Sequence, residues 1–375
     1  MNILFLSVSA GGGHSKTAEV IKEYIELNYP DSKSQIVDTY RYVSPVLDKL
    51  VIGSYLKTLK LNPKLWGKIY NLAEKDENTN DIMQKINKIL SYKIKKFIRE
   101  FKPDILICTH PFPLQMVCEM KKKNAFDIPI VNIITDYSTH SFWIDENVDA
   151  YIVAHEMLIY EMTEKGVPRE KIFPLGLPVS QKFLIKREKS ELLKHYDLED
   201  KLTFLLMGGS LGMGEIKKLF IKLLESDLDF QIIIVCGKNQ KLKKQIEKLY
   251  TDSNLNKKAV ILGFTNSVHE LMTISDWIIT KPGGLTVTEA VLMTLPIVIM
   301  SPLPGQEEIN TNYLLNNGLG VKLENINNFE RLYHQYLNNP LRIKQIKEMS
   351  LYLSKPNATT DIVNFLYDYV KNRVE

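Results

Sequence analysis

The stretch WIITKPGGLTVTEA, residues 277–290, decides the fold class of this chain. It opens with an apolar run typical of a buried strand, passes through Lys281-Pro282-Gly283-Gly284, and continues into a helix-like segment that contains Glu289. A buried strand that leads through glycines into a helix is the building unit of parallel α/β sheets. The same glycines let backbone N–H groups approach a ligand at the start of the helix.

The C-terminal half repeats this alternation of strand and helix. Four further apolar runs have the length of buried strands and cover residues 202–207, 231–236, 259–262 and 297–300. The pattern is that of a doubly wound parallel sheet. Gly208-Gly209-Ser210-Leu211-Gly212 follows the first run, and a helix is predicted to begin near Glu215. Two glycine-rich helix starts in one half can hold a pyrophosphate between them without a cation.

Three polar residues near these loops are suited to sugar recognition. Glu289 lies one turn into its predicted helix, where it could reach the hydroxyls of a ribose; it could equally be a surface glutamate that favours the helix dipole. Gln306 and Glu307 stand at a helix start, where an amide and a carboxylate can bind the hydroxyls of a hexose. The alternative for this pair is a helix cap with an acidic first turn.

The N-terminal half predicts a second α/β unit. Its strand-like runs cover residues 2–9, 35–37, 105–108 and 130–134, and a helical pattern covers 16–27. We therefore predict two Rossmann-like domains that face a central cleft, because ligands in open α/β sheets bind beyond the carboxyl ends of the strands. The predicted domains are residues 1–185 and residues 186–355. A last helix, within 356–375, could pack back on the N-terminal domain or dock on the other half.

His14 ends the glycine cluster that separates the first strand from the first helix. An unperturbed histidine pKa lies near the working pH, so His14 is suited to take a proton from an acceptor hydroxyl. One alternative is a tight strand-to-helix turn in which His14 has no role. Another is a dinucleotide site with Asp38 as the ribose acid, although the glycine spacing is not G-x-G-x-x-G.

Residues 44–101 form an insertion that we predict to be helical and to face a membrane. Between Lys49 and Lys102 there are 13 Lys or Arg and 5 Asp or Glu, a local net charge of +8, whereas the whole chain carries +4. Lysines that alternate with aromatic residues suit a surface resting on anionic lipid headgroups. The candidate membrane residues are Tyr55, Lys57, Lys60, Lys64 and Trp66. The alternative is a solvated basic helix whose apolar face packs on its own domain.

Composition narrows the remaining classes of function. A chain of 375 residues, 45% hydrophobic and 25% charged, is globular and long enough for two domains. Its apolar start lacks the basic leader of a secretory signal, and its longest uncharged run, 290–306, is shorter than the roughly 20 residues of a spanning helix. The three cysteines lack the spacing of a zinc site or a disulfide framework. We expect a cytoplasmic protein, peripheral at most, that binds no nucleic acid.

A bound metal is not expected. Asp227-Leu228-Asp229 has the D-x-D spacing of metal-dependent sugar transferases, but it falls at a predicted helix-to-strand turn and has no companion ligands. We therefore predict that the chain uses neither a metal nor any other cofactor.

The motifs taken together resemble glycosyltransferase family 28, and the resemblance spans nearly the whole chain. The segments that carry it, in chain order, are residues 11–15, Thr109-His110-Pro111, Thr135-Asp136-Tyr137 with His140 and Trp143, Gly208-Gly209-Ser210, residues 281–286 with Glu289, and Pro304-Gly305-Gln306-Glu307 with Asn310. The chain is most similar to the diacylglycerol glucosyltransferases of low-GC Gram-positive bacteria and the plastid monogalactosyldiacylglycerol synthases. The related peptidoglycan N-acetylglucosaminyltransferases carry a G-G-T-G-G-H loop, whereas here three glycines follow Ala10.

This resemblance implies a GT-B fold, inversion at the anomeric carbon, and a UDP-sugar held by the C-terminal half. It implies that the pyrophosphate is bound by Gly209, Ser210, Gly283, Gly284 and Thr286. Phe264 would lie by the uracil, Glu289 would hold the ribose, and Gln306 and Glu307 would contact the hexose, with Leu285 and Asn310 in the same donor set. The acceptor set implied is Gly12, Gly13, His110, His140 and Trp143. The catalytic base would be His14 or Asp136.

We accordingly predict inverting transfer of a hexose, glucose above all, from a UDP-sugar to 1,2-diacylglycerol at the inner face of the cell membrane. The expected partners are the UDP-sugar, diacylglycerol and an anionic lipid surface. Whether the enzyme adds further sugars processively is left open. The alternatives are N-acetylglucosamine transfer from its UDP donor to a peptidoglycan lipid intermediate, a UDP-sugar epimerase of GT-B architecture, and a UDP-sugar sensor without turnover.

Overall fold

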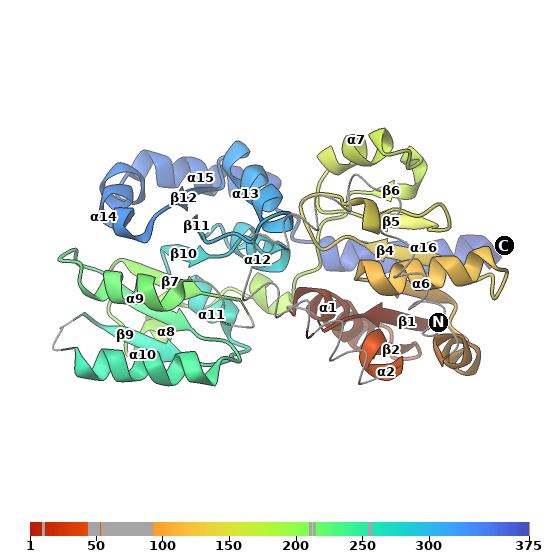
Figure 1. The fold of residues 1–375 in the computed structure, drawn as a ribbon, viewed down its shortest axis with the longest axis horizontal. Coiled ribbons are helices and arrows are strands. Elements are labelled where there is room, and N and C mark those ends of the chain that lie inside the picture. Colours follow the sequence, from red (N-terminus) through yellow and green to blue (C-terminus); the bar gives the residue numbers. More distant parts are fainter. Residues whose placement is uncertain are drawn as a thin grey trace. The chain divides into compact units, whose positions relative to one another are not determined.

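The computed structural model describes residues 1–9, 12–43, 53, 93–209, 212, 215–253 and 257–374. The chain divides into two compact units, whose elements are labelled in Figure 1. Unit 1 consists of Met1–Ser180, Pro304–Gln306 and Lys355–Glu375, and unit 2 of Gln181–Leu303 and Glu307–Ser354. Each unit contains a six-stranded sheet in which the paired strands are parallel.

The sheet of unit 1 has the strand order β2-β1-β3-β4-β5-β6. Its strands are β1 (Asn2–Ser7), β2 (Lys33–Asp38), β3 (Ile105–Cys108), β4 (Ile130–Ile133), β5 (Ala150–Ile152) and β6 (Ile172–Phe173). Its helices are α1 (Gly13–Asn28), α2 (Thr39–Val43), α6 (Pro111–Lys122), α7 (Met157–Glu164) and α16 (Ala358–Val374), together with the short turns η2 (Ser141–Trp143) and η3 (Arg169–Lys171). Residues 93–101 are also helical.

The central strands of unit 1 are apolar on both faces because helices cover both sides of a parallel sheet. Ile3 lies opposite Ile105 in the ladder and Phe5 opposite Ile107, so these four side chains share one face. They pack in one buried cluster with the apolar side of α1, whose Ala18, Ile21 and Ile25 recur at helical spacing. The predicted first strand and first helix are thus confirmed in the structure.

Helix α16 belongs to the core of unit 1 although most of its sequence neighbours belong to unit 2. Ile362, Val363 and Leu366 of α16 are fully buried in the same cluster as β1 and α1. The rings of Tyr29 and Tyr367 stack with their centroids 4.1 Å apart. Helix α16, at the blue end of the colour scale in Figure 1, contacts α1, which is near the red end. The sequence left open which half this helix joins, and these contacts assign it to unit 1.

The sheet of unit 2 has the order β12-β11-β10-β7-β8-β9. Its strands are β7 (Thr203–Met207), β8 (Gln231–Val235), β9 (Ala259–Leu262), β10 (Trp277–Thr280), β11 (Ile297–Met300) and β12 (Gly320–Leu323). Its helices are α8 (Lys189–His195), α9 (Ile216–Leu224), α10 (Gln240–Asp252), α11 (Val268–Thr273), α12 (Gly284–Leu292), α13 (Gln306–Asn316), α14 (Phe329–Leu332) and α15 (Pro340–Leu353).

Aromatic packing fills one face of the second sheet. Phe204 of β7 meets Phe230 edge to face at a centroid distance of 5.0 Å, and Phe329 of α14 lies 5.5 Å from Phe204. Trp277 of β10 and Phe220 of α9 are fully buried in the same cluster. Such offset and edge-to-face ring pairs stabilise a core beyond the area they bury. The five strands predicted in this half are all present.

Three strands were missed by sequence reasoning. Strands β5 and β6 have three and two residues, too few to show a pattern. Strand β12 carries Lys322 in its middle and therefore lacks the uninterrupted apolar run of its neighbours. The three cysteines are buried free thiols. The prediction of two parallel α/β sheets is confirmed.

Candidate functional site

In each unit, predicted site residues gather where the order of strands reverses. In unit 1 the chain passes from β1 to β2 on one side and then to β3 on the other side of β1. The loops after β1 and β3 therefore flank the topological switch point, where open α/β sheets bind ligands. His14 follows β1 and Thr109 follows β3. A hydrogen bond between these two residues joins the two loops at the switch point.

The imidazole of His14 is held in one orientation by two threonines. Its Nδ1 lies 2.7 Å from the carbonyl oxygen of Thr109 and 2.9 Å from the hydroxyl of Thr135. A carbonyl oxygen can only accept, so Nδ1 donates to it and carries the proton of the neutral ring. The lone pair of the neutral imidazole is therefore on Nε2. This tautomer is the one a general base needs when Nε2 faces the substrate.

Burial sets the charge state of His14. Its pKa is lowered from 6.5 to about 4, because desolvation by burial outweighs the hydrogen bond to the Thr109 carbonyl, which raises the pKa. The ring is thus neutral at pH 7 and able to accept a proton. The sequence alone assigned His14 an ordinary pKa near the working pH, and burial changes that value.

His110 and His140 act as helix caps. His110 Nδ1 accepts the N–H of Phe112 at 3.2 Å at the start of α6, and His140 Nδ1 accepts the N–H of Phe142 at 3.2 Å at the start of η2. In their neutral forms both rings therefore carry the proton on Nε2, as donors. His110 meets His14 edge to face at 4.5 Å, and burial, followed by the neighbouring His14, holds the pKa of His110 well below its usual range.

Trp143 and Asp136 complete the acceptor-side set in unit 1. The ring centroid of Trp143 lies 6.0 Å from that of His14. The backbone carbonyl oxygen of Trp143 accepts a 3.0 Å hydrogen bond from the fully buried Asn132 of β4. Asp136 follows Thr135, one of the two threonines on His14, and is only 3% exposed. The structure therefore brings the loops after β1, β3 and β4 together around His14.

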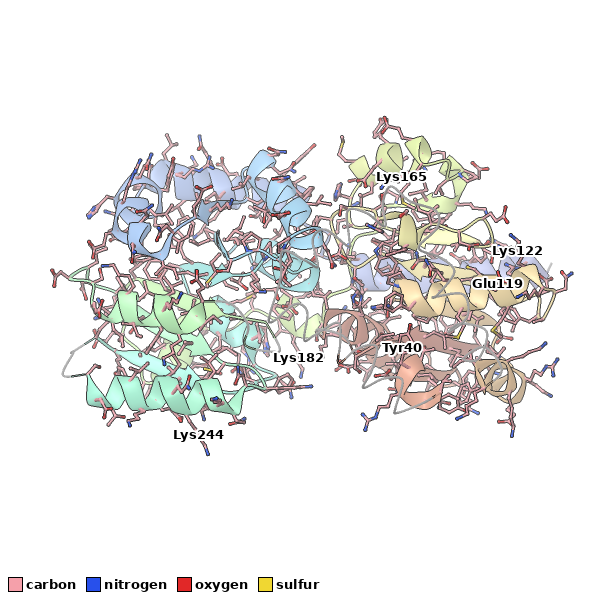
Figure 2. The ribbon with its side chains drawn as sticks, viewed as in Figure 1. Tyr40, Glu119, Lys122, Lys165, Lys182 and Lys244 are labelled. Carbon is pink, nitrogen blue, oxygen red and sulfur yellow. The ribbon has the colours of Figure 1, made fainter. Side chains whose placement is uncertain are left out.

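Helix α7 fixes the loop that carries Asp136 and His140. The backbone N–H of Thr139 donates to Glu161 Oε1 at 2.9 Å, and the hydroxyl of Thr139 donates to the same oxygen at 2.5 Å. Lys165, labelled in Figure 2, donates from its Nζ to the Thr139 carbonyl at 2.8 Å. Glu161 and Lys165 were not predicted as site residues, because nothing in their own segment indicates which loop they hold.

The glycine loop before His14 allows close approach of its backbone. Gly12 caps α1 with φ of +93°, in the left-handed region that favours glycine. Gly13 begins the helix, and a Cβ built there would meet no atom within 4 Å. The first backbone N–H groups of α1 have no partner within the helix and are available to a ligand at this end.

Unit 2 has the same arrangement at its own switch point. The chain runs from β7 through β8 and β9 and returns to place β10 on the other side of β7. Gly209 follows β7 with φ of +69°, and Gly283 caps α12 after β10. Among the described residues, no atom lies within 4 Å of a Cβ built on either glycine. The two predicted pyrophosphate loops therefore follow neighbouring strands.

Glycine is required at Gly212, close to this loop. Its φ is +55°, and a Cβ there would lie 2.5 Å from the carbonyl oxygen of Cys236, a distance that real Cβ atoms do not show. The N–H of Gly212 donates to the Gly209 carbonyl at 3.0 Å and closes the turn. A larger residue would displace this loop from the end of β8.

Helix α13 is attached to the loop after β10. Gln306 is the first residue of α13 and Glu307 the second. The carboxylate of Glu307 lies 3.7 Å from Lys281 Nζ, and the fully buried Asn310 donates from Nδ2 to the Pro282 carbonyl at 2.9 Å. Lys281 was part of a predicted motif but was given no role. The structure places its ammonium against a predicted hexose-binding carboxylate.

The remaining donor-side residues lie on α12 and after β9. Leu285, Thr286 and Glu289 are on the first two turns of α12, and Leu285 is buried. Phe264 follows β9, and its ring is 55% exposed, with Lys238 Nζ 5.4 Å from the ring centroid. An exposed aromatic ring beside a cation can stack on a flat base.

Six predicted site residues lie outside the described part of the chain. They are Ser210 and the membrane candidates Tyr55, Lys57, Lys60, Lys64 and Trp66.

Comparison with known proteins identifies the family. Residues 14–179 match the family model of monogalactosyldiacylglycerol (MGDG) synthase, and residues 189–352 match that of glycosyl transferases group 1. A processive diacylglycerol beta-glucosyltransferase of Bacillus cereus (strain AH187) is 30% identical over 384 residues, covering 100% of this chain and 94% of that protein. The corresponding protein of Bacillus cytotoxicus is 30% identical over 376 residues, covering 98% and 93%. The chain belongs to the diacylglycerol glucosyltransferase family.

Solved structures share the fold of this diacylglycerol glucosyltransferase family member. MurG of Acinetobacter baumannii superimposes with a TM-score of 0.63 at 16% identity, covering 98% of this chain and 99% of that one. UDP-GlcNAc 2-epimerase of Neisseria meningitidis, bound to UDP-GlcNAc, gives 0.64 at 18% identity over 98% and 100%. At these identities the likeness shows the fold alone, and that fold is the predicted GT-B architecture of two parallel α/β units.

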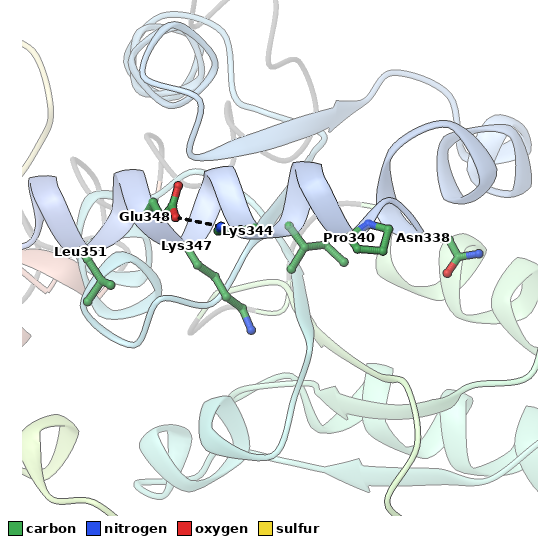
Figure 3. Close-up of a pocket in the computed structure, with 7 residues that line it drawn as sticks. Asn338, Pro340, Lys344, Lys347, Glu348 and Leu351 are labelled. Atoms are coloured by element: carbon green, nitrogen blue, oxygen red, sulfur yellow. Dashed lines mark ion pairs between the residues drawn. The ribbon is translucent and has the colours of Figure 1, made fainter.

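Surface features of the family member lie apart from these site residues. A groove of about 410 Å³ runs along α15 past Ile343, Lys347 and Leu351, and Figure 3 shows the ion pair of Lys344 with Glu348 at 3.8 Å beside it. Among the described residues, no group of three or more His, Cys, Asp or Glu side chains is placed to hold a metal ion. No helix within the described ranges has both the length and the apolar character needed to cross a bilayer.

Proposed function

We propose that this protein transfers glucose from UDP-glucose to the free hydroxyl of 1,2-diacylglycerol, with inversion at the anomeric carbon, and so makes a glycosyl-diacylglycerol. The full-length likeness to processive diacylglycerol beta-glucosyltransferases supports both substrates and the addition of further sugars to the product. The observation that carries the chemistry is the neutral His14, whose Nδ1 is bound to Thr109 and whose Nε2 is therefore the proton acceptor.

His14 would act as the general base. Its Nε2 takes the proton of the diacylglycerol hydroxyl while the hydroxyl oxygen forms its bond to the anomeric carbon. The ring is oriented by Thr109 and Thr135, so little ordering remains at the moment of reaction. Asp136, buried beside Thr135, is the second candidate for this role. A single displacement on an α-linked donor gives a β-linked product, the linkage named for the Bacillus relatives.

The leaving group is UDP, and the bond that breaks joins the anomeric carbon to the diphosphate oxygen. That oxygen keeps the electron pair and gains negative charge. The N-terminus of α12 and the glycine turn after β7 offer backbone N–H groups at neighbouring strand ends, where such charge is stabilised. We propose that these groups replace a metal ion in the reaction.

We further propose that the protein works as a peripheral enzyme on the inner face of the cell membrane. Its acceptor is a membrane lipid, and the sequence between Lys49 and Lys102 carries a net charge of +8. Each basic residue close to an anionic surface contributes on the order of 1 kcal/mol to binding. Several together would keep the enzyme at the bilayer while leaving the binding reversible.

One assay tests the proposal. The purified protein is offered radiolabelled UDP-glucose, UDP-galactose or UDP-N-acetylglucosamine with vesicles that contain diacylglycerol, and the lipid products are separated. We expect label in a monoglucosyl lipid first and in lipids with more sugars later. Label from UDP-galactose alone would change the assigned hexose. Conversion of a UDP-sugar without any lipid product, as an epimerase would give, would overturn the proposal.

A further inference from the structure

Lys281 is a nearly buried cation among the donor-side residues of unit 2. It follows β10, is 8% exposed, and places its Nζ 3.7 Å from Oε2 of Glu307. Burial lowers the pKa of Lys281, and the neighbouring Glu307 carboxylate works against that shift. The Glu307 side chain is 16% exposed, so both members of the ion pair are largely removed from water.

The carboxylate of Glu307 is held from two directions. The backbone N–H of Leu303 donates to Oε2 at 2.6 Å from within the loop before α13, and the Lys281 ammonium approaches the same oxygen from the neighbouring strand. One turn further along α13, Asn310 donates to the carbonyl of Pro282, the residue after Lys281. Helix α13 is thus tied to the loop after β10 at two points three residues apart, which lie on one side of the helix.

The Lys281–Glu307 ion pair is unfavourable if its only role is to stabilise the fold. Removing two charges from water is unfavourable before their attraction is counted, and a well-packed neutral pair of similar volume is often at least as stable. The Glu307 carboxylate already accepts a hydrogen bond from the backbone N–H of Leu303, so a buried ammonium is not needed to give it a partner. A cation at this place is explained better by what it does to the carboxylate.

We propose that Lys281 is a positioning residue for recognition of the donor hexose: its ammonium fixes the direction and the charge of the Glu307 carboxylate, so that Glu307 can accept hydrogen bonds from hexose hydroxyls. The inference rests on the proposed function, in which Glu307 contacts the hexose of UDP-glucose. Hydrogen bonds to a charged acceptor are about twice as strong as neutral ones, but only where the acceptor is already oriented. Lys281 therefore acts on the hexose through Glu307, and UDP, which has no hexose, should bind without its help.

The test compares binding of UDP and UDP-glucose by calorimetry in Lys281→Met, Glu307→Gln and the double variant. We expect Lys281→Met to raise the Kd for UDP-glucose about tenfold while the Kd for UDP stays within about twofold. The double variant should bind UDP-glucose no more weakly than Glu307→Gln alone, because a neutral amide has no charge for Lys281 to hold. Lys322→Met removes an exposed Lys–Glu pair from β12, with Lys322 Nζ 3.3 Å from Glu324, and should leave both constants unchanged.

Two results would overturn the inference. Equal weakening of UDP and UDP-glucose in Lys281→Met would show that Lys281 acts on the diphosphate or on the loop itself. The second result concerns the double variant. If adding Lys281→Met to Glu307→Gln raises the Kd for UDP-glucose by the same factor as it does in the wild-type protein, the two residues act independently. Should Lys281→Met fail to fold around an unpaired carboxylate, the double variant has no buried charge and still permits comparison with Glu307→Gln. Failure of the proposed function is separate, since the wild-type protein would then transfer no glucose to diacylglycerol.

Discussion

The Nδ1 atom of His14 lies 2.7 Å from the carbonyl oxygen of Thr109, a residue 95 positions further along the chain. The contact joins the loops after β1 and β3 at the switch point of the first sheet. It decides which imidazole nitrogen holds the proton, and so directs the basic Nε2 away from the backbone. Both the proposed role of His14 as a base and its pH dependence rest on this contact.

Replacing His14 should remove catalysis and spare donor binding. In His14→Ala we expect kcat to fall by roughly 10²–10⁴, the usual contribution of a general base. The Kd for UDP should stay within about twofold, because the loops proposed to bind the diphosphate belong to unit 2. Single-turnover rates with UDP-glucose and diacylglycerol vesicles measure the first quantity and calorimetry the second. His334→Ala, an exposed histidine in unit 2, is the control. Wild-type turnover in His14→Ala would remove His14 from the mechanism.

The decline of kcat/KM on the acidic side should occur at an unusually low pH. Burial lowers the pKa of His14 to about 4, so its base form persists in the free enzyme down to that pH. We expect kcat/KM to decline as the pH falls through about 4, when the ring gains a proton and can no longer accept one. Rates measured between about pH 3 and 7.5 at constant ionic strength check this. A decline near pH 6.5 would mean that the ring is solvated in the working enzyme.

Removal of divalent metals should leave the enzyme active. In the proposed mechanism, the diphosphate is held by backbone donors and the positive helix end at the start of α12, and by the turn that begins at Gly209 after β7. We expect protein treated with EDTA and desalted to transfer glucose at the untreated rate, and added Mn²⁺ to give no increase. Activity that disappears with EDTA and returns with Mn²⁺ would show that a cation does this work.

Shortening a buried side chain of α16 should destabilise unit 1. Leu366 is fully buried in the cluster that contains β1 and α1, so Leu366→Ala removes packing and leaves a cavity at a cost of about 2–5 kcal/mol. Leu351→Ala is the matched control, because Leu351 is 65% exposed on α15. Thermal unfolding of both variants should show a lower midpoint for the unit 1 transition in Leu366→Ala only. Equal midpoints would mean that α16 is not part of that core.

Much of the fold was readable from local sequence. The runs around Ile105, Ile130 and Ile232 are short, β-branched and bounded by turn residues, and each forms a buried parallel strand. The starts of α12 and α13 were also predicted, because glycine, proline and acidic residues mark helix N-termini. The missed strands β6 and β12 are held by neighbours in the sheet and have little apolar pattern of their own.

The candidate site was predictable as a set of residues but not as an arrangement. Sequence motifs singled out His14, Glu307 and Asn310, yet gave no reason to pair Lys281 with Glu307 or to direct Asn310 to the Pro282 carbonyl. Those contacts join segments more than 20 residues apart, so their partners depend on strand order. Glu161, which binds the loop after β4 through Thr139, has no motif around it and could be found only in the structure.

By itself, the sequence determined two parallel α/β halves and the glycine-opened helices within them, because strand burial, glycine conformation and helix starts are properties of a few neighbouring residues. The tertiary structure alone decided that His14 meets Thr109, that its pKa falls to about 4, and that α16 returns to the first core. Burial and hydrogen-bond partners depend on segments far apart in the chain, and only the packed strands and helices bring those segments together.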